Sequence, residues 1–152
     1  MTKVVGAVAV VIALAFAGFA FAASQGDSYG VSAKLKASSE VPKPSGVPAA
    51  ATGKFTGTYV ELANDKARLT WKLTFSHLSG SAIAAHIHIG KPGKAGPVAL
   101  ALCGPCHSGQ KGKGMLTHAQ VAKIEAGAAY VNVHTQKNPG GEIRGQVKVT
   151  EG

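Results

Sequence analysis

The sequence predicts an all-β protein: an antiparallel, Greek-key-like sandwich or barrel of about eight short strands with one short helix. Three observations support this fold class. Apolar and polar residues alternate with period two over most segments. Clusters of Gly, Pro, Asn and Asp separate these segments at regular spacing. Helix signals gather in one place, near residues 117–126. Many short strands joined by such turns are typical of sandwiches and barrels.

The first half of the chain predicts three strands. The pattern of residues 31–37 is that of a half-buried strand, and the Pro-rich residues 40–48 predict an ordered loop or edge segment. Residues 53–62 form the second strand. Residues 66–75 alternate most regularly, with apolar side chains at every second position: Ala67, Leu69, Trp71, Leu73 and Phe75. Asn64-Asp65 is a turn signal between them, so these two strands form a hairpin.

The second half predicts four more strand segments and the helix. Strands are expected at residues 83–89, 97–102, 129–134 and 142–149, the last with Ile143, Val147 and Val149 facing inward. Gly90 to Gly96 forms a tight loop, and the Gly- and Lys-rich residues 103–114 predict a mobile loop. Thr117 and Gln120 have the spacing of a capping box. Gly127 stands where a helix-ending glycine belongs.

The N-terminal segment has the pattern of a secretory signal peptide. Lys3 is followed by residues 4–23, which contain 18 apolar residues, two glycines and no charge. Ala20-Phe21-Ala22 supplies the small-x-small pattern of a cleavage site, so cleavage is expected after Ala22 or Ala23. An uncleaved anchor is the alternative, because 20 apolar residues can span a bilayer.

This segment defines the expected domain organisation. Residues 1–23 are the signal, residues 24–30 are a short extension, and residues 31–150 form one domain without a membrane span. Export to the periplasm or the medium follows. From residue 24 onward, 50 of 129 residues are apolar and only two are Cys. This composition excludes a disulfide-dense scaffold and general disorder.

The expected mature chain is basic, with 15 Lys and Arg against 7 Asp and Glu. No acidic residue lies between Lys66 and Ile124, a stretch with eight cations. Such a charge attracts small anions, acidic polysaccharide, anionic lipid or an acidic surface of an extracellular protein. A solvated basic surface is the alternative. Nucleic acid is not expected, because the protein is exported and its lysines are not interleaved with stacking aromatic residues.

Three histidines are candidate metal ligands. His86 and His88 are two apart in one predicted strand, so they share a face, opposite to Ile87. In residues 130–134 the same alternation places His134 with Tyr130 and Asn132 on a polar face. The three imidazoles converge if these two strands are neighbours. Neutral imidazole is a good ligand for copper, zinc or iron. Ordinary hydrogen-bonding surface histidines are the alternative.

Cys103 and Cys106 allow several interpretations. With His107 they match the C-x-x-C-H pattern of covalent haem c attachment, for which Met115 or a free His could be a further axial ligand. They also fit a small disulfide that braces a Gly-rich loop, a thioredoxin-like redox pair, or a Cys/His contribution to a metal site. A disulfide is the interpretation favoured for an exported protein, and haem is the less favoured one.

Other catalytic patterns are missing from the sequence. His77 and His118 are expected at the surface, and Glu142 and Arg144, two apart, are positioned to pair with each other. No nucleophile elbow, phosphate loop or dinucleotide fingerprint is present.

Several motifs together resemble the CHRD domain, a family first described as a repeat in chordin and widespread in exported bacterial proteins. The resemblance rests on Ala85–Gly90 (AHIHIG), Pro92-Gly93, Gly96-Pro97-Val98, Tyr130–Thr135 (YVNVHT) and Asn138–Gln146 (NPGGEIRGQ). Leu35 through Glu40-Val41-Pro42 is similar to the N-terminal pattern of the family, although Lys43 replaces its usual second proline. The resemblance implies an all-β extracellular domain and suggests an interaction module.

The His-x-His strand is also partly similar to the copper site of Cu/Zn superoxide dismutases. This similarity carries over to His86, His88 and His134 alone, because the bridging His and the zinc-binding Asp of those enzymes have no counterpart here. The first functional hypothesis is therefore an exported metal-binding domain, with a superoxide dismutase type of activity as its extension. A non-catalytic structural or interaction module and a small haem carrier are the alternatives.

Overall fold

The computed structural model describes residues 26–150. The expected signal segment and its cleavage positions lie outside these residues. The elements are β1 (Ser28–Lys36), the 3-10 turn η1 (Ala37–Ser39), β2 (Thr52–Leu62), β3 (Lys66–Ser76), β4 (Ala82–Ile89), β5 (Val98–Cys103), β6 (Gln110–Thr117), α1 (His118–Glu125), β7 (Ala129–Thr135), β8 (Ile143–Gln146) and β9 (Lys148–Thr150). None of the helices in this part of the chain is long and apolar enough to cross a membrane.

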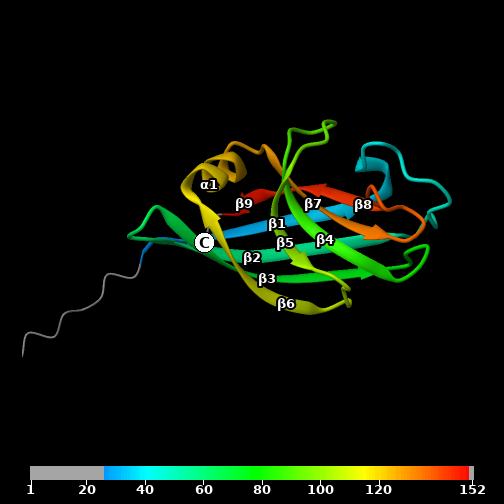
Figure 1. Cartoon of the computed structure of the whole chain (residues 1–152), viewed down its shortest axis with the longest axis horizontal. Coiled ribbons are helices and arrows are strands. Elements are labelled where there is room, and N and C mark those ends of the chain that lie inside the picture. Colours follow the sequence, from blue (N-terminus) through cyan, green and yellow to red (C-terminus); the bar gives the residue numbers. More distant parts are fainter. Residues whose placement is uncertain (1–25, 151–152) are drawn as a thin grey trace, which may run out of the picture.

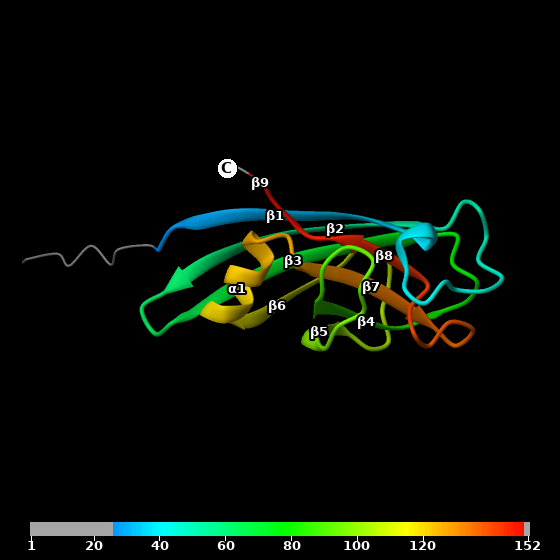
Figure 2. The ribbon, with the colours of Figure 1, turned by 90° about the horizontal axis from the view of Figure 1, so that it is seen from above.

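The strands form a nearly closed antiparallel barrel, which confirms the predicted fold class. Their order is β5-β4-β7-β8-β1-β2-β3-β6, and β9 pairs with β1. The two end strands meet, since a Cβ atom added at Gly114 of β6 would lie 2.6 Å from the Leu100 side chain of β5. The barrel is flattened, with β1 and β2 along one side and β4 and β5 along the other (Figures 1 and 2).

The barrel interior holds the alternate residues of the strands. In β3 the inward positions are Ala67, Leu69, Trp71 and Leu73, all at most 5% exposed, as the alternation predicts. β2 and β3 pair over their full lengths, from Thr52 opposite Ser76 to Leu62 opposite Lys66. The hairpin prediction is therefore correct. Val149 is an exception: it lies opposite Val31 in the ladder but is 37% exposed, because β9 is a short edge strand paired with β1 alone.

The prediction of a mobile loop over residues 103–114 is wrong in its second half. β6 begins at Gln110 and pairs with β3 along eight residues. Its inward positions are Gly112 and Gly114, which leave room for the Trp71 ring and the Leu100 side chain. Glycine takes the place of the apolar residue in the alternation, so a search for apolar residues at every second position overlooks this strand.

The helix prediction is correct. Thr117 is the N-cap of α1, its side chain accepts a hydrogen bond from the Gln120 backbone, and the Gln120 side chain accepts one from the Thr117 backbone. Val121 and Ile124 are buried. Gly127 follows the C-cap with a φ of +66°, a conformation that glycine adopts without strain.

Candidate metal centre

Three histidines converge on the outside of the barrel. β4 and β7 are neighbouring antiparallel strands, with His86 opposite Asn132 in the ladder. His86 and His88 point away from the interior, where Ile87 of the same strand is 1% exposed. His134 lies two residues beyond Asn132 and therefore shares its face. The three imidazoles were expected to converge if their two strands are neighbours, and β4 and β7 are neighbours in the sheet.

The three rings lie close enough to share one ion. One ring nitrogen from each histidine lies within 4.8 Å of the other two. His86 Nδ1 and His134 Nε2 are 3.0 Å apart. Ligand nitrogens of one tetrahedral zinc lie about 3.3 Å apart when each bond is about 2.0–2.1 Å. The spacing therefore fits a single small ion after modest rotation of the side chains.

The covering loops determine which nitrogens face the cluster. His88 Nδ1 donates to the Gly96 carbonyl at 2.8 Å, in the β4–β5 loop (residues 90–97). His134 Nδ1 donates to the Pro139 carbonyl at 2.9 Å, in the β7–β8 loop (residues 136–142). A carbonyl only accepts, so both Nδ1 atoms carry the proton and both Nε2 atoms keep a lone pair. Metal-bound histidines are usually held in this way through their second nitrogen.

Several buried polar atoms around the histidines have no hydrogen-bond partner. His88 is 9% exposed, and its Nε2 atom is one of them. The others nearby are Asn132 Oδ1, Arg144 Nη1 and Glu40 Oε2, in side chains at most 2% exposed. Buried polar groups are normally paired, so a group of such atoms points to an ion or water bound among them.

The histidines are suited to be neutral ligands. Burial and the facing His134 and His88 rings lower the pKa of His86 below its ordinary value of 6.5. Burial and His88 also lower the pKa of His134, against the opposing effect of its bond to the Pro139 carbonyl. Both rings are therefore largely uncharged at neutral pH, the form that binds a metal ion.

A stack of three side chains supports the His88 ring. The rings of His88 and Tyr130 are parallel within 4°, with centroids 4.8 Å apart. The third member is the Arg144 guanidinium, which lies over the Tyr130 ring, 3.4 Å from its centroid. Arg144 Nη2 also donates to the carbonyls of Lys91 and Lys94, at 3.1 and 2.9 Å. The stack thus ties the β4–β5 loop to the barrel above the histidines.

A hollow of about 400 Å³ adjoins this stack. Glu40, Arg144 and Gln146 line it together with residues of η1 and the β4–β5 loop. Burial raises the pKa of Glu40, although the Val41 N–H and the Arg144 charge act in the opposite direction. The hollow therefore places open space directly beside Glu40 and Arg144, next to the histidines.

Glu142 holds the other covering loop and does not pair with Arg144 as the sequence suggested. Its carboxylate accepts hydrogen bonds from Ser79, Thr135 and Asn138, the Ser79 N–H at 2.6 Å and the Asn138 amide at 3.0 Å. Burial by itself would raise the pKa of Glu142, but these bonds outweigh it and lower the pKa. The network fixes the β7–β8 loop, which supplies the Pro139 carbonyl to His134.

Tyr130, Asn132 and His134 share the outward face of β7 as predicted, but this face is not at the surface, as the alternative interpretation of these histidines required. Every residue of β7 is buried, including Tyr130, Asn132 and His134. The covering loops form a second layer over the outside of the barrel, so outward-facing residues are enclosed as well. Strand alternation separates the two faces of a sheet, but it does not show that one of them will be covered by loops.

Cys103 and Cys106 form a disulfide, with Cα atoms 5.3 Å apart. Neither sulfur in this bond is a free thiol, the group that a thioether link to haem requires. His107 is exposed, as are His77 and His118. Within residues 26–150, the three-histidine group on β4 and β7 is the one set of His, Cys, Asp or Glu side chains close enough to hold a metal ion.

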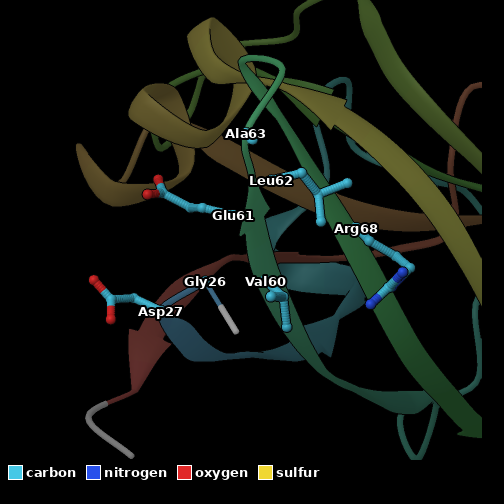
Figure 3. Close-up of a pocket in the computed structure, with 7 residues that line it drawn as sticks. All are labelled: Gly26, Asp27, Val60, Glu61, Leu62, Ala63 and Arg68. Carbon is cyan, nitrogen blue, oxygen red and sulfur yellow. The ribbon is translucent and has the colours of Figure 1, made fainter. Parts of the chain in front are cut away.

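A larger hollow, of about 570 Å³, lies away from the histidines at the β2–β3 turn (Figure 3). Gly26, Asp27, Glu61 and Arg68 are among the residues that line it. It contains no histidine, so size alone would direct attention to the wrong part of the molecule. The hollow beside Arg144 is smaller but lies next to the buried polar cluster.

The fold and the site define a small antiparallel β-barrel whose outer surface carries a loop-covered histidine cluster. The family model of the CHRD domain matches residues 31–147, and the chain belongs to this family. The motifs that suggested the resemblance supply His86, His88, His134 and the residues that anchor them. No curated protein and no solved structure matches the chain.

Glu40 and Arg144 are the residues whose place in the site sequence reasoning missed. Glu40 lies in a Pro-rich segment remote from the histidines in sequence. The Glu40 carboxylate and the Asn132 amide both lie where a side chain at Gly141 would be, which brings the segment after η1 against the β7–β8 loop. The sequence spacing suggested Glu142 as the partner of Arg144. No local signal indicated that the Arg144 guanidinium would stack on the Tyr130 ring.

Proposed function

We propose that this protein is an exported CHRD domain that binds one transition-metal ion through His86, His88 and His134. Copper or zinc suits a set of three imidazole nitrogens best. The observation that carries the proposal is the orientation of the rings: two Nδ1 atoms are engaged by loop carbonyls, and the unpartnered His88 Nε2 is buried beside the other two rings.

The surroundings favour a bound ion over three independent hydrogen-bonding histidines. In the His86–His134 contact one proton satisfies two rings, while His88 Nε2 keeps a buried lone pair. Leaving a buried polar atom unpaired costs about 1–3 kcal/mol. A metal ion accepts that lone pair together with those of the two neighbours, and the lowered pKa values of His86 and His134 reduce competition from protons.

A redox activity is the extension of this proposal. A copper or iron ion held by these residues would supply one-electron chemistry of the superoxide dismutase type. The chain contributes the buried Arg144 guanidinium and the hollow of about 400 Å³ beside it, where a small anion fits. The cations expected to steer that anion are mostly elsewhere: Lys66, Arg68, Lys72, Lys111 and Lys113 lie on β3 and β6.

Export and the interaction-module alternative rest on other observations. The apolar N-terminal segment, the family, and the Cys103–Cys106 disulfide all support an oxidising compartment outside the cytoplasm. The hydrogen bonds from His88 and His134 to two loop carbonyls are also compatible with a non-catalytic interaction module. In such a module the histidines would serve to hold the loops in place.

Calorimetric titration of metal-free protein with Cu²⁺ and with Zn²⁺, followed by elemental analysis, tests the metal site. We expect one ion per chain, and loss of that binding in His88→Gln and His134→Gln. His118→Gln is the matched control, because His118 is exposed on α1. Absence of binding in the wild type, or equal loss in the His118→Gln control, would contradict the proposal and favour the interaction module.

A further inference from the structure

Within residues 26–150, the outward positions of five strands of the barrel carry many cations and no acid. The outward positions of the adjacent strands β9, β1, β2, β3 and β6 carry nine Lys or Arg residues, all exposed. We call this surface the cationic face; its members are Lys34, Lys36, Lys54, Lys66, Arg68, Lys72, Lys111, Lys113 and Lys148. They are 9 of the 16 Lys and Arg residues in the chain. The histidine cluster lies on β4 and β7. β4 lies across the flattened barrel from β1 (Figure 2), and β5 stands between β4 and β6.

Cations directly face each other across the strands of this surface. Lys34 is the ladder partner of Lys54, and Lys72 is the partner of Lys111. Side chains opposite each other in antiparallel strands have Cβ atoms about 4.5–5.5 Å apart, and like charges there are destabilising. A surface needed only for solubility has no reason to concentrate charge of one sign in this way, because mixed signs serve that purpose better.

Two acids near one end of this surface point away from it. Asp27 and Glu61 lie beside Arg68 in the hollow at the β2–β3 turn, but both carboxylates extend to the other side of the strands from the Arg68 guanidinium (Figure 3). Glu40 and Glu142 are buried under the loops on the histidine side. Asp65 stands next to Lys66 in the β2–β3 turn and offsets charge at that end of the face, but within residues 26–150 no acid occupies an outward position of these strands.

Hydroxyl groups fill the positions between the cations. Thr56, Thr58, Thr70 and Thr74 face outward on β2 and β3. Thr56, Thr70 and Thr74 lie opposite Lys72, Lys113 and Lys54, whereas Thr58 lies opposite Thr70. Strands about 4.8 Å apart, with outward residues about 6.7 Å apart along each strand, make a flat array of alternating ammonium and hydroxyl groups. Such an array offers charge to an anionic group and hydrogen bonds to the sugar hydroxyls beside it.

We propose that the cationic face binds an extended acidic polysaccharide. Its outward positions contain no aromatic residue, so the stacking platform used for single-stranded nucleic acid is missing from the described strands. Among the described residues, Met115 is the most exposed large apolar side chain at an outward position of these strands, at 47%. One such side chain is too little for insertion into a lipid surface. Repeated carboxylates or sulfates with hydroxyls between them match both features of the array.

Binding of the purified protein to a size-defined polyuronate oligosaccharide from alginate tests this proposal. The informative variant is Lys54→Gln/Lys72→Gln/Lys111→Gln. The matched control is Lys91→Gln/Lys94→Gln/Lys123→Gln, which removes the same charge from exposed positions outside the face. We expect about a tenfold rise in Kd for the first variant and less than about a twofold rise for the control. Added salt should weaken wild-type binding.

Three outcomes would overturn the proposal. The first is no binding of the polyuronate at physiological salt, with neutral dextran as the reference. The second is an equal loss in both triple variants, which indicates attraction by net charge alone. The third is tighter binding to anionic phospholipid vesicles or to single-stranded DNA of equal charge concentration, lost in the same variant. None of these outcomes depends on the metal site, and thermal unfolding checks that both variants are folded.

Discussion

The two sides of the barrel follow the same strand alternation but differ in what their outward residues do. On β4, β7 and β8 the outward residues lie under loops, and they are histidines, Tyr130, Asn132 and Arg144, with several polar atoms unpartnered. On β1, β2, β3, β6 and β9 no loop covers the outward residues, and most of them are cations or threonines. The alternation thus builds the interior, whereas the loops decide which part of the exterior becomes a site.

This difference assigns separate chemistry to each side. An enclosed cluster of imidazoles can hold a small ion, because its donors are already oriented. An open array of cations attracts a large anionic partner but encloses nothing. Nine of the 16 Lys and Arg residues belong to the second surface, and a smaller group surrounds the histidines: Lys43, Lys91, Lys94, Lys137 and Arg144.

The largest expected effect comes from the carboxylate that holds the covered side together. Glu142→Ala leaves buried donors of Ser79, Thr135 and Asn138 unpaired, so we expect the free energy of unfolding to fall by about 3 kcal/mol or more. Lys72→Ala on the bare side should change it by less than about 0.5 kcal/mol. Chemical denaturation of both variants measures the two changes in the free energy of unfolding. Equal losses would show that the two sides of the barrel do not differ in this way.

A smaller effect is expected from pH. The pKa values of His86 and His134 are lowered in the folded state, so the unfolded chain binds more protons below about pH 6.5. Stability of the metal-free protein should therefore be complete above that pH and decline as the pH falls through the lowered values. Urea unfolding between pH 7.5 and 5 measures this decline.

The double variant His86→Gln/His134→Gln isolates the contribution of these two rings, since the raised pKa of Glu40 acts in the opposite direction. We expect a flatter pH profile for this variant than for the wild type. An unchanged slope would show that the two histidines are not the groups whose protonation is suppressed by folding.

The smallest effect is expected on the bare side. Replacing Lys111 by Gln removes one of two like charges that face each other across β3 and β6. The free energy of unfolding should rise by about 0.2–1 kcal/mol at low salt, and the gain should shrink as salt screens the repulsion. Thermal unfolding at two ionic strengths measures it. A loss of stability at low salt would mean that Lys72 and Lys111 do not repel each other.

Much of the fold follows from the sequence, and particular residues show where prediction ends. The alternation of β3 and the capping box of Thr117 and Gln120 are local signals, and both predictions were correct. β6 was missed because Gly112 and Gly114 occupy its inward positions, where the Trp71 and Leu100 side chains fill the space. A local sequence pattern does not indicate how large the side chain is that packs against a position from another strand.

The histidine cluster was likewise predictable from local spacing only in part. The shared face of His86 and His88 follows from their spacing, but the approach of His134 depends on β4 and β7 being neighbours, which only the strand order determines. The burial of Glu40 and the stacking of Arg144 on Tyr130 depend on loops packed over the barrel. Such long-range contacts leave no periodic signal, so the sequence suggested the ligands but not their enclosure.

Loop carbonyls hold the Nδ1 atoms of His88 and His134, and we infer that this leaves both Nε2 atoms able to bind one ion in the cluster. Long-range ¹H–¹⁵N NMR correlation of the imidazole rings tests it most directly, because it distinguishes protonated from unprotonated ring nitrogens. Metal-free protein at neutral pH should show both rings protonated at Nδ1 alone, and one equivalent of Zn²⁺ should shift both Nε2 resonances. Protonation at Nε2, or resonances unchanged by Zn²⁺, would contradict the account.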